Sequence, residues 1–387
     1  MNVLYITEIS PFPINGGERI RAYGLLKAFN NIANNMIAII GNTDHVDLQT
    51  YSQKYDFNKT TFIPFNEEYT SWNSKVTKYF KKNPKLMDLI HNIDLKTINL
   101  VILDYNFKGQ YIDFFKDHNI SVIYGTHNSQ SNLTLQLETI NHTQYIKKIF
   151  SYFLQVFHEY HYFNKADKLL VVSSEDAKFH SKFIEHSNII IIPNFLDEDL
   201  YQTYSNNKKN YIVMTANFNA FQNHYGLQWF LENIWDADLS KKIKLLLVGK
   251  GSDTVLNKLN YVNDNSIEEI GMVDDITTYI SKAKLSIIPL LHGSGTRLKC
   301  LESMALKTLI VGTEIGVEGI VHHNSILTSN EPKEFKKLLL DVINNNLDIE
   351  KHTNNAYQTF IDYYSLSCVQ QQLHSLVTSI HMKNKNV

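Results

Sequence analysis

Cysteine is scarce in this chain of 387 residues, and an excess of charge of either sign is missing. The two cysteines, Cys300 and Cys368, cannot supply a disulfide framework or a four-cysteine zinc site, so we expect a reducing compartment. Lys and Arg together number 37 against 39 for Asp and Glu, which gives a formal net charge of −2. Such a balance creates no overall field for nucleic acid, and we predict no nucleic-acid partner.

Long apolar runs are also absent from the sequence. The longest are strand-like pieces such as residues 188–193, far short of the roughly 20 residues that cross a bilayer. The chain opens without basic residues, and Glu8 falls where a signal peptide needs its apolar stretch. We therefore expect no membrane span and a cytoplasmic protein.

Short apolar runs alternate with longer helical patterns along most of the chain. This alternation is typical of βαβ units, and its two series of strands predict an α/β fold of two Rossmann-like domains. The expected strands of the first series are 3–7, 36–40, 100–104, 122–126, 169–172 and 189–193, and those of the second are 212–215, 244–248, 267–271, 285–289 and 309–312.

The polar stretch between the two series predicts a domain boundary. We place an N-terminal domain at residues 1–195, a linker at 196–210 and a C-terminal domain at 211–360. Residues 361–387 are expected to form a helical segment that could cap either domain, and packing back on the N-terminal domain is the expectation that we carry forward. Ligands of such sheets bind at the carboxyl ends of the strands, so the loops there are where chemistry is expected.

Two loops of the first domain are candidates for ligand contacts. Gly16 and Gly17 open a helix after the first strand, and adjacent glycine amides at a helix N-terminus suit a diphosphate. The alternative is a tight turn without a ligand. His127 follows the fourth expected strand and could donate a hydrogen bond to a sugar hydroxyl, although most of the 16 histidines must be surface or structural residues.

The most informative segment, residues 287–305, leads from a strand through a glycine-rich turn into a helix. Ser294, Gly295 and Thr296 form the turn, which is followed by Arg297, Lys299 and Glu302. Two cations beside glycine amides at a helix start predict a diphosphate site, and a carboxylate about one turn later suits a ribose diol. The alternative, a capped helix with a solvated face, accounts for single charges but not for all three together with the glycines.

Two further glycine-rich loops follow strands of the second domain. Glu318 and Gly319 lie in one of them, where a carboxylate and backbone amides could meet a ligand; a plain loop is equally compatible with the sequence. Gly249 begins half of a dinucleotide fingerprint, but Thr254 stands where the third glycine belongs.

Together these motifs resemble the GT-B glycosyltransferases, and most closely the retaining enzymes of family four, many of which build bacterial surface polysaccharides. The resemblance runs over nearly the whole chain. It is carried by residues 11–21, His127-Asn128, residues 166–173 and 192–194, Asn223 before Trp229-Phe230, residues 247–251, 271–273, Pro289 and the block 293–305.

The resemblance implies that the two Rossmann-like domains face each other across a cleft. It also implies a nucleotide-sugar donor on the second domain and an acceptor on the first. It matches Arg297 and Lys299 to the residues that hold the donor diphosphate, and Glu302 to the glutamate on the ribose. Ser294 stands where most relatives carry a first acid, and residues 215–223 lack the usual cations. Arg297 and Lys299 are therefore expected to carry that charge alone.

The other implied contacts come from several loops. Gly16, Gly17 and His127 would approach the phosphate and the sugar, and the turn 317–319 would meet them through its amides. Met272 and Val273 would lie near the base.

The implied reaction is hexosyl transfer with retention, without metal or cofactor, from a UDP- or GDP-linked sugar to a glycan or lipid-linked acceptor. The oriented amides and cations stabilise the departing diphosphate.

A basic and aromatic stretch at residues 72–85 adds a candidate peripheral contact with the inner leaflet of a membrane, with a solvated helix face as the alternative. Two other functions stay open on the same fold. One is a sugar-nucleotide epimerase, for which His127 alone is a thin supply of acid and base. The other is a non-catalytic partner subunit, which would not need the cations of the 293–305 block.

Overall fold

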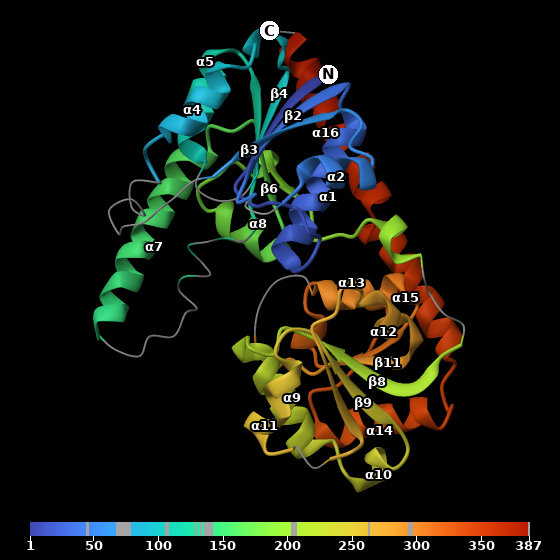
Figure 1. Cartoon of the computed structure of the whole chain (residues 1–387). Helices are drawn as coiled ribbons and strands as arrows, with labels where there is room; N and C mark the ends of the chain where they lie inside the picture. The colour runs from blue at the N-terminus through green and yellow to red at the C-terminus, as the bar shows by residue number, and fades with distance from the viewer. Residues whose placement is uncertain are drawn as a thin grey trace. The chain divides into compact units, whose positions relative to one another are not determined.

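The structure is a computed structural model that describes residues 1–43, 46–66, 79–104, 108–127, 129, 131, 134, 142–202, 207–261, 264–292 and 297–385. The chain divides into two compact units (Figure 1). Unit 1 comprises Met1–Pro193 together with Val369–Val387, and unit 2 comprises Asn194–Cys368.

Unit 1 is built on a parallel sheet of seven strands in the order β3-β2-β1-β4-β5-β6-β7. The strands are β1 (Asn2–Thr7), β2 (Asn35–Gly41), β3 (Thr60–Phe65), β4 (Leu100–Asp104), β5 (Ser121–Gly125), β6 (Lys168–Val171) and β7 (Ile189–Ile191). The helices are α1 (Gly17–Ile32), α2 (Leu48–Lys54), α4 (Pro84–His91), α5 (Ile112–Asp117), α7 (His142–Phe163), α8 (Ser174–His180) and, from Val369 onward, α16 (Leu366–Lys385).

The central strands of unit 1 are mostly apolar, as expected where helices cover both faces of a parallel sheet. Every residue of β4 and β5 is buried. Leu103 and Val122 contribute to a large core cluster together with Phe115 of α5 and Phe163 of α7. The buried strands and their core cluster thus hold the polar residues at the carboxyl ends of these strands in place.

Unit 2 repeats this architecture with six parallel strands in the order β10-β9-β8-β11-β12-β13. The strands are β8 (Lys209–Thr215), β9 (Lys244–Val248), β10 (Ile267–Gly271), β11 (Ala283–Ile288), β12 (Leu309–Gly312) and β13 (Leu327–Thr328). The helices are α9 (Phe221–Asn233), α10 (Ala237–Ser240), α11 (Ser252–Leu259), α12 (Thr277–Lys282), α13 (Leu298–Ala305), α14 (Pro332–Ile343) and α15 (Ile349–Tyr364), with short 3₁₀ turns at Glu198–Tyr201 and Ile315–Val317.

The predicted fold class is confirmed, since both units are parallel α/β sheets of the Rossmann type. All the expected strands are present, with ends shifted by a few residues. The sequence analysis missed β3 and β13, which both lie at the edge of a sheet. β3 contains Pro64 and exposes part of its length, and β13 has two residues, so neither gives a continuous apolar run.

The expected linker at 196–210 differs from the structure, where the described residues of this stretch belong to unit 2. Leu196 is buried, donates its backbone N–H to the Tyr364 carbonyl at 2.9 Å and accepts from the Leu366 N–H at 2.8 Å. Lys208 donates to the carbonyl of Ser281 at 2.8 Å. These contacts attach the stretch to unit 2, and its polar composition gives no sign of them in the sequence.

The expected C-terminal segment at 361–387 is also divided differently, because α16 passes to unit 1 at Val369. Val369 and Leu373 are fully buried, and Gln370 accepts a hydrogen bond from Asn31 of α1 at 2.8 Å. Over the described part of the chain, no helix combines the length and the apolar character needed to span a membrane.

Candidate active site

The loops that follow β11 and β12 form the candidate site of unit 2. Because these neighbouring strands are parallel, their carboxyl ends lie at one edge of the sheet. The Thr313 hydroxyl donates to the carbonyl of Leu290 and accepts from the N–H of Gly316 at 2.9 Å, which ties the two loops together. A Cβ at Gly316 would lie 2.1 Å from the Ile288 carbonyl oxygen, so only glycine fits this turn.

Arg297 is the residue that caps the N-terminus of α13. Its Nε donates to the carbonyl of Ile315 at 3.1 Å, and its guanidinium lies 3.4 Å from a carboxylate oxygen of Glu318. The Arg297 side chain is 10% exposed, and burial lowers its pKa while Glu318 opposes that effect. The structure therefore brings two predicted site residues together at the β12 loop, with the cation at the helix start.

Lys299 lies in the first turn of α13 and is held by a residue of α9. Its Nζ donates to Oδ1 of Asn223 at 2.9 Å, and Nδ2 of Asn223 donates to the carbonyl of Asn217 at 2.9 Å. Burial lowers the pKa of Lys299 to about 8. An ammonium group that is short of solvent gains more from an anionic ligand than one in water does.

Glu302 follows Lys299 by three residues, on the same side of α13. It accepts a hydrogen bond from the Tyr201 hydroxyl. Burial raises the pKa of Glu302 to about 7, although nearby Lys299 and the Tyr201 bond oppose the rise. The predicted trio of Arg297, Lys299 and Glu302 thus stands within the first two turns of one helix.

The other residues predicted for unit 2 have mixed placements. Gly249 has φ 126°, and a Cβ there would lie 2.2 Å from the Ala216 carbonyl oxygen, so the backbone itself requires glycine. Met272 is 70% exposed, whereas Val273 packs against a small core cluster on one face of the sheet. The carbonyl of Gly319 accepts from the Tyr364 hydroxyl at 3.3 Å. Ser294, Gly295 and Thr296 lie outside the described residues.

Sequence reasoning missed an aromatic cluster near these cations. The rings of Phe221 and Tyr225 stack at 5.8 Å, and His292 lies 5.1 Å from the Tyr225 ring. Phe221 is 66% exposed, and it lies with Tyr225 on α9, the helix that also carries Asn223. The i, i+4 spacing of the two α9 aromatics was the available signal.

In unit 1, the first strand leads into α1 through the predicted glycine pair. Gly16 is the N-cap residue with φ 78°, and Gly17 is the first helical residue. No side chain caps the helix, and a Cβ on Gly16 would meet no atom within 4 Å. The glycine is thus required by its positive φ alone, and both residues are exposed with amides at a helix start.

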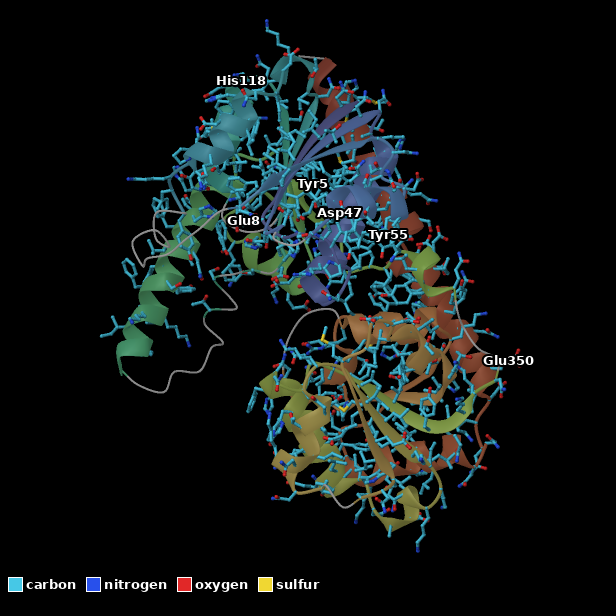
Figure 2. All side chains as sticks on the ribbon, viewed as in Figure 1. Tyr5, Glu8, Asp47, Tyr55, His118 and Glu350 are labelled. Atoms are coloured by element: carbon cyan, nitrogen blue, oxygen red, sulfur yellow. The ribbon has the colours of Figure 1, made fainter. Side chains whose placement is uncertain are left out.

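His127 lies at the end of β5 and is buried against a carboxylate that the sequence analysis missed. Its Nε2 is 3.2 Å from Oδ1 of Asp104, and Oδ2 of Asp104 accepts from the Tyr5 hydroxyl at 2.5 Å (Figure 2 labels Tyr5). Burial raises the pKa of Asp104, but His127, Tyr5 and Arg21 outweigh it and hold this pKa below its ordinary value. The signal for Asp104 was its position at the end of an apolar strand.

A second ion pair lies at the same carboxyl-end edge of the unit 1 sheet. Lys108 Nζ lies 2.5 Å from Oε1 of Glu8, the residue after β1 (Figure 2 labels Glu8). The Lys108 side chain is 2% exposed, and its backbone N–H donates to the Tyr124 hydroxyl at 3.1 Å. These charges are paired inside unit 1.

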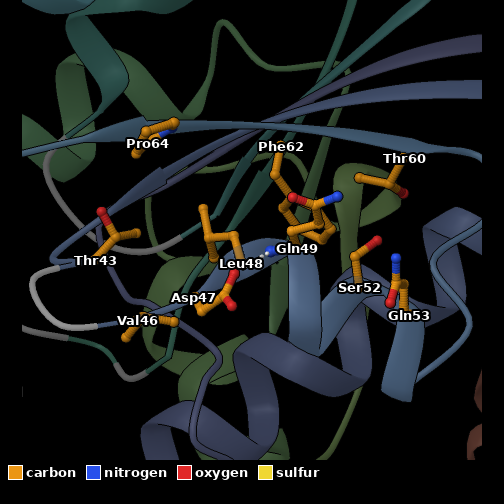
Figure 3. Close-up of a pocket in the computed structure, with 10 residues that line it drawn as sticks. All are labelled: Thr43, Val46, Asp47, Leu48, Gln49, Ser52, Gln53, Thr60, Phe62 and Pro64. Atoms are coloured by element: carbon orange, nitrogen blue, oxygen red, sulfur yellow. Dashed lines mark hydrogen bonds between the residues drawn. The ribbon is translucent and has the colours of Figure 1, made fainter.

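A pocket of about 580 Å³ lies between α2 and β3 of unit 1 (Figure 3). It is lined by side chains without a cation, namely Thr43, Val46, Asp47, Leu48, Gln49, Ser52, Gln53, Thr60, Phe62 and Pro64. Asp47 accepts from the Gln49 N–H at 3.1 Å and so caps α2. None of the predicted site residues lines this pocket.

Comparison with known families decides the class of unit 2. Residues 209–345 match the family described as "Glycosyl transferases group 1". Unit 2 carries a group 1 glycosyl transferase domain. This domain contains β8 to α14 and all the unit 2 residues predicted for the site.

Similarity to individual proteins extends over nearly the full chain. An uncharacterized 44.6 kDa protein in the cps region of Klebsiella pneumoniae is 20% identical, over 94% of this chain and 96% of that protein. The structure of Anabaena HepE in complex with UDP matches with a TM-score of 0.67 at 12% identity, over 98% of this chain and 100% of that one. Sucrose-phosphate synthase from Thermosynechococcus elongatus matches with a TM-score of 0.71 at 15% identity, over 99% of both chains.

These structural likenesses establish that the two-unit fold is that of the GT-B glycosyltransferases.

Within the described ranges, no group of three or more His, Cys, Asp or Glu side chains is placed to hold a metal ion.

Proposed function

We propose that this protein is a glycosyltransferase that moves a hexosyl group from a nucleotide-diphosphate sugar to a glycan or lipid-linked acceptor. The observation that carries the proposal is the arrangement of Arg297, Lys299 and Glu302 at the start of α13, inside the group 1 domain. Two cations and the helix start favour a diphosphate, and a carboxylate one turn on suits ribose hydroxyls.

We propose UDP or GDP as the nucleotide and surface polysaccharide synthesis as the process. HepE is described in complex with UDP and with UDP-glucose, and the Klebsiella protein belongs to a cps region. Met272, exposed after β10, is our candidate for the contact with the base.

In the proposed reaction the bond between the anomeric carbon and the β-phosphate oxygen breaks, and the acceptor hydroxyl oxygen bonds to that carbon on the same face. The acceptor proton passes to the leaving phosphate, and configuration is retained. Arg297 and Lys299 offset the charge that develops on the diphosphate. His127, held by Asp104, donates to a sugar hydroxyl, and the Gly16-Gly17 amides and the 317–319 turn approach the sugar and phosphate.

The first test is a thermal-shift screen of nucleotide sugars, because a ligand that binds only the folded protein raises the melting temperature. Donors that shift the protein are then assayed for sugar transfer to glycan and lipid-linked acceptors, with and without EDTA. We expect transfer that EDTA does not reduce, and an α-linked product from an α-linked donor. Absence of any nucleotide binding would favour the non-catalytic partner, and a changed donor sugar without transfer would favour the epimerase.

A further inference from the structure

Helix α7 of unit 1 carries a row of exposed apolar side chains. Its large apolar residues with about half or more of their surface exposed are Tyr145, Ile146, Phe150, Phe153, Phe157 and Tyr160. At 3.6 residues per turn, all of these except Tyr145 fall within an arc of roughly 80° around the helix. We call this row the α7 face. In Figure 1 the N-terminal part of α7 extends beyond the described helices and the sheet of unit 1.

The opposite side of α7 is unusually polar where it packs on unit 1. Gln155, His158 and Glu159 are buried there, and Glu159 accepts from the Ser131 hydroxyl at 2.5 Å. Gln155 accepts from the Thr134 hydroxyl at 2.7 Å. A surface helix of a globular protein normally turns its apolar stripe inward. Although Tyr162 and Phe163 at the end of α7 pack into the core, the rings of the α7 face point outward. Among the described residues of unit 1, the α7 face therefore has no apolar surface that buries it.

Exposed lysines adjoin the α7 face. The ring of Phe80 contacts that of Phe157 at 5.7 Å, edge to face, and Phe80 is followed directly by Lys81 and Lys82. Lys81, Lys82 and Lys85 are exposed, as is Lys147 on α7 itself. Residues 79–85 are the described part of the basic and aromatic stretch expected to meet a membrane, and residues 72–78 lie outside the described ranges. The contact between Phe80 and Phe157 therefore places the exposed lysines of residues 81–85 next to the α7 face.

We propose that the α7 face and the lysines of residues 81–85 dock unit 1 on the surface of a lipid bilayer that contains anionic lipids. An apolar face with Phe and Tyr lies at the depth where headgroups meet acyl chains, and nearby lysines pair with anionic headgroups. The glutamate of α7 is buried and bonded, so the described exposed residues of this helix carry no carboxylate to repel such a surface. This complementarity selects an anionic bilayer over a second copy of the chain, which would oppose lysines to lysines.

The test measures co-sedimentation of the full-length protein with vesicles of phosphatidylcholine, alone or with about 30% phosphatidylglycerol. We expect binding to the anionic vesicles that weakens when salt is raised from about 0.1 M to about 0.5 M. A variant with Phe150→Gln, Phe153→Gln and Phe157→Gln is expected to lose at least about tenfold in vesicle affinity. Lys81→Glu with Lys82→Glu is expected to lose as much on anionic vesicles and nothing on neutral ones.

Matched controls change the same residue types elsewhere. Tyr363→Gln with Met382→Gln removes two exposed apolar side chains outside α7, and Lys333→Glu with Lys351→Glu reverses two exposed lysines of unit 2. Both controls should bind vesicles like the wild type. Circular dichroism and melting temperature check that each variant folds, which exposed positions should permit.

Wild-type affinity in the triple Gln variant, or no vesicle binding by the wild type, would overturn the proposal. A wild-type dimer that becomes monomeric in the triple variant, without vesicle binding, would assign the α7 face to a second copy instead. Thermal shift by the nucleotide sugar, measured without vesicles, is independent of this surface. The membrane inference can therefore fail while the proposed function stands, and the reverse also holds.

Discussion

The carboxyl-end edges of the two sheets use charged residues in opposite ways. In unit 1, Tyr5, Asp104 and Arg21 are almost completely buried and interact with one another. In unit 2, Arg297, Lys299 and Glu302 remain partly exposed, and burial shifts the pKa of each away from its ordinary value.

This difference indicates that charges stabilise the fold in unit 1 and are available for ligand binding in unit 2. Buried charges that pair with one another fix the positions of strands and loops, and they are costly to break. Charges whose side chains remain partly exposed can be reached by a ligand. We therefore expect substitutions at the unit 1 edge to lower stability, and those at the unit 2 edge to lower donor binding and turnover.

The largest expected effect is at the unit 2 edge. Lys299→Ala and Glu302→Ala should each lower kcat/KM for the nucleotide sugar by roughly 100-fold or more, because each removes a charge proposed to contact the donor. Initial rates at varied donor concentration measure this. Lys333→Ala, at an exposed position of α14, serves as the control. Near-wild-type kinetics in both site variants would mean that the donor binds elsewhere.

The next effect concerns stability at the unit 1 edge. Asp104→Asn should lower the free energy of unfolding by about 2 kcal/mol, since it removes a buried charge between Tyr5, His127 and Arg21. Urea denaturation followed by circular dichroism measures the loss. Asp117→Asn, at an exposed position of α5, should leave the midpoint unchanged. An Asp104 variant as stable as the wild type would remove the contrast between the two edges.

A smaller effect is expected where α9 supports α13. Asn223→Ala should lower kcat/KM by about tenfold, because Lys299 loses the amide oxygen that positions it while keeping its charge. The loss should appear in KM for the donor more than in kcat. Asn233→Ala, at the exposed end of the same helix, is the matched control. A double variant with Lys299→Ala should be no worse than Lys299→Ala alone.

The pH dependence of kcat/KM sharpens the same comparison. Glu302, with a pKa of about 7, accepts ribose hydroxyls best when ionised, and Lys299, with a pKa of about 8, holds phosphate only when protonated. Activity should therefore rise toward pH 7 and fall above pH 8, by up to about tenfold per pH unit outside this window. Lys299→Arg should move the basic limb to higher pH. A basic limb unchanged in that variant would contradict the assignment.

The smallest effect is a pH-dependent stability of unit 1. His180 is fully buried among Phe163, Phe179 and Phe183, and burial lowers its pKa from 6.5 to about 4. The unfolded chain then binds a proton that the folded chain does not, so stability falls as the pH drops from about 6.5 toward 4. At pH 6 the loss is about 0.8 kcal/mol. His180→Phe should remove this part of the dependence, whereas His118→Phe, at an exposed site, should not.

The sequence predicted the sheets well because parallel strands buried on both faces leave continuous apolar runs. It also predicted the grouping of Arg297, Lys299 and Glu302, since one helix turn fixes their spacing. It could not predict the partners Asn223 and Tyr201, which come from α9 and from a polar stretch that resembles a linker. Long-range pairs of this kind depend on how elements pack and leave no local pattern.

Asp104 was missed for a related reason. A single carboxylate at the end of an apolar strand has no distinguishing spacing, and its role appears only when Tyr5 and His127 arrive from two other strands. The apolar residues of α7 were visible as a helical pattern, but such a pattern is normally assigned to a core. The sequence does not tell which side of that helix the rest of the unit covers.

The route of the chain through the two units has a consequence for biosynthesis. Unit 1 is discontinuous, because residues 194–368 intervene between its first part and the stretch from Val369 onward. During synthesis on the ribosome, the sheet of unit 1 is made first, but the α16 segment that packs on unit 1 is made only after all of unit 2. Unit 2 is continuous in sequence, so all of its strands are available before unit 1 is complete. An expression fragment of the first unit should therefore be made as residues 1–193 joined by a short linker to residues 369–387.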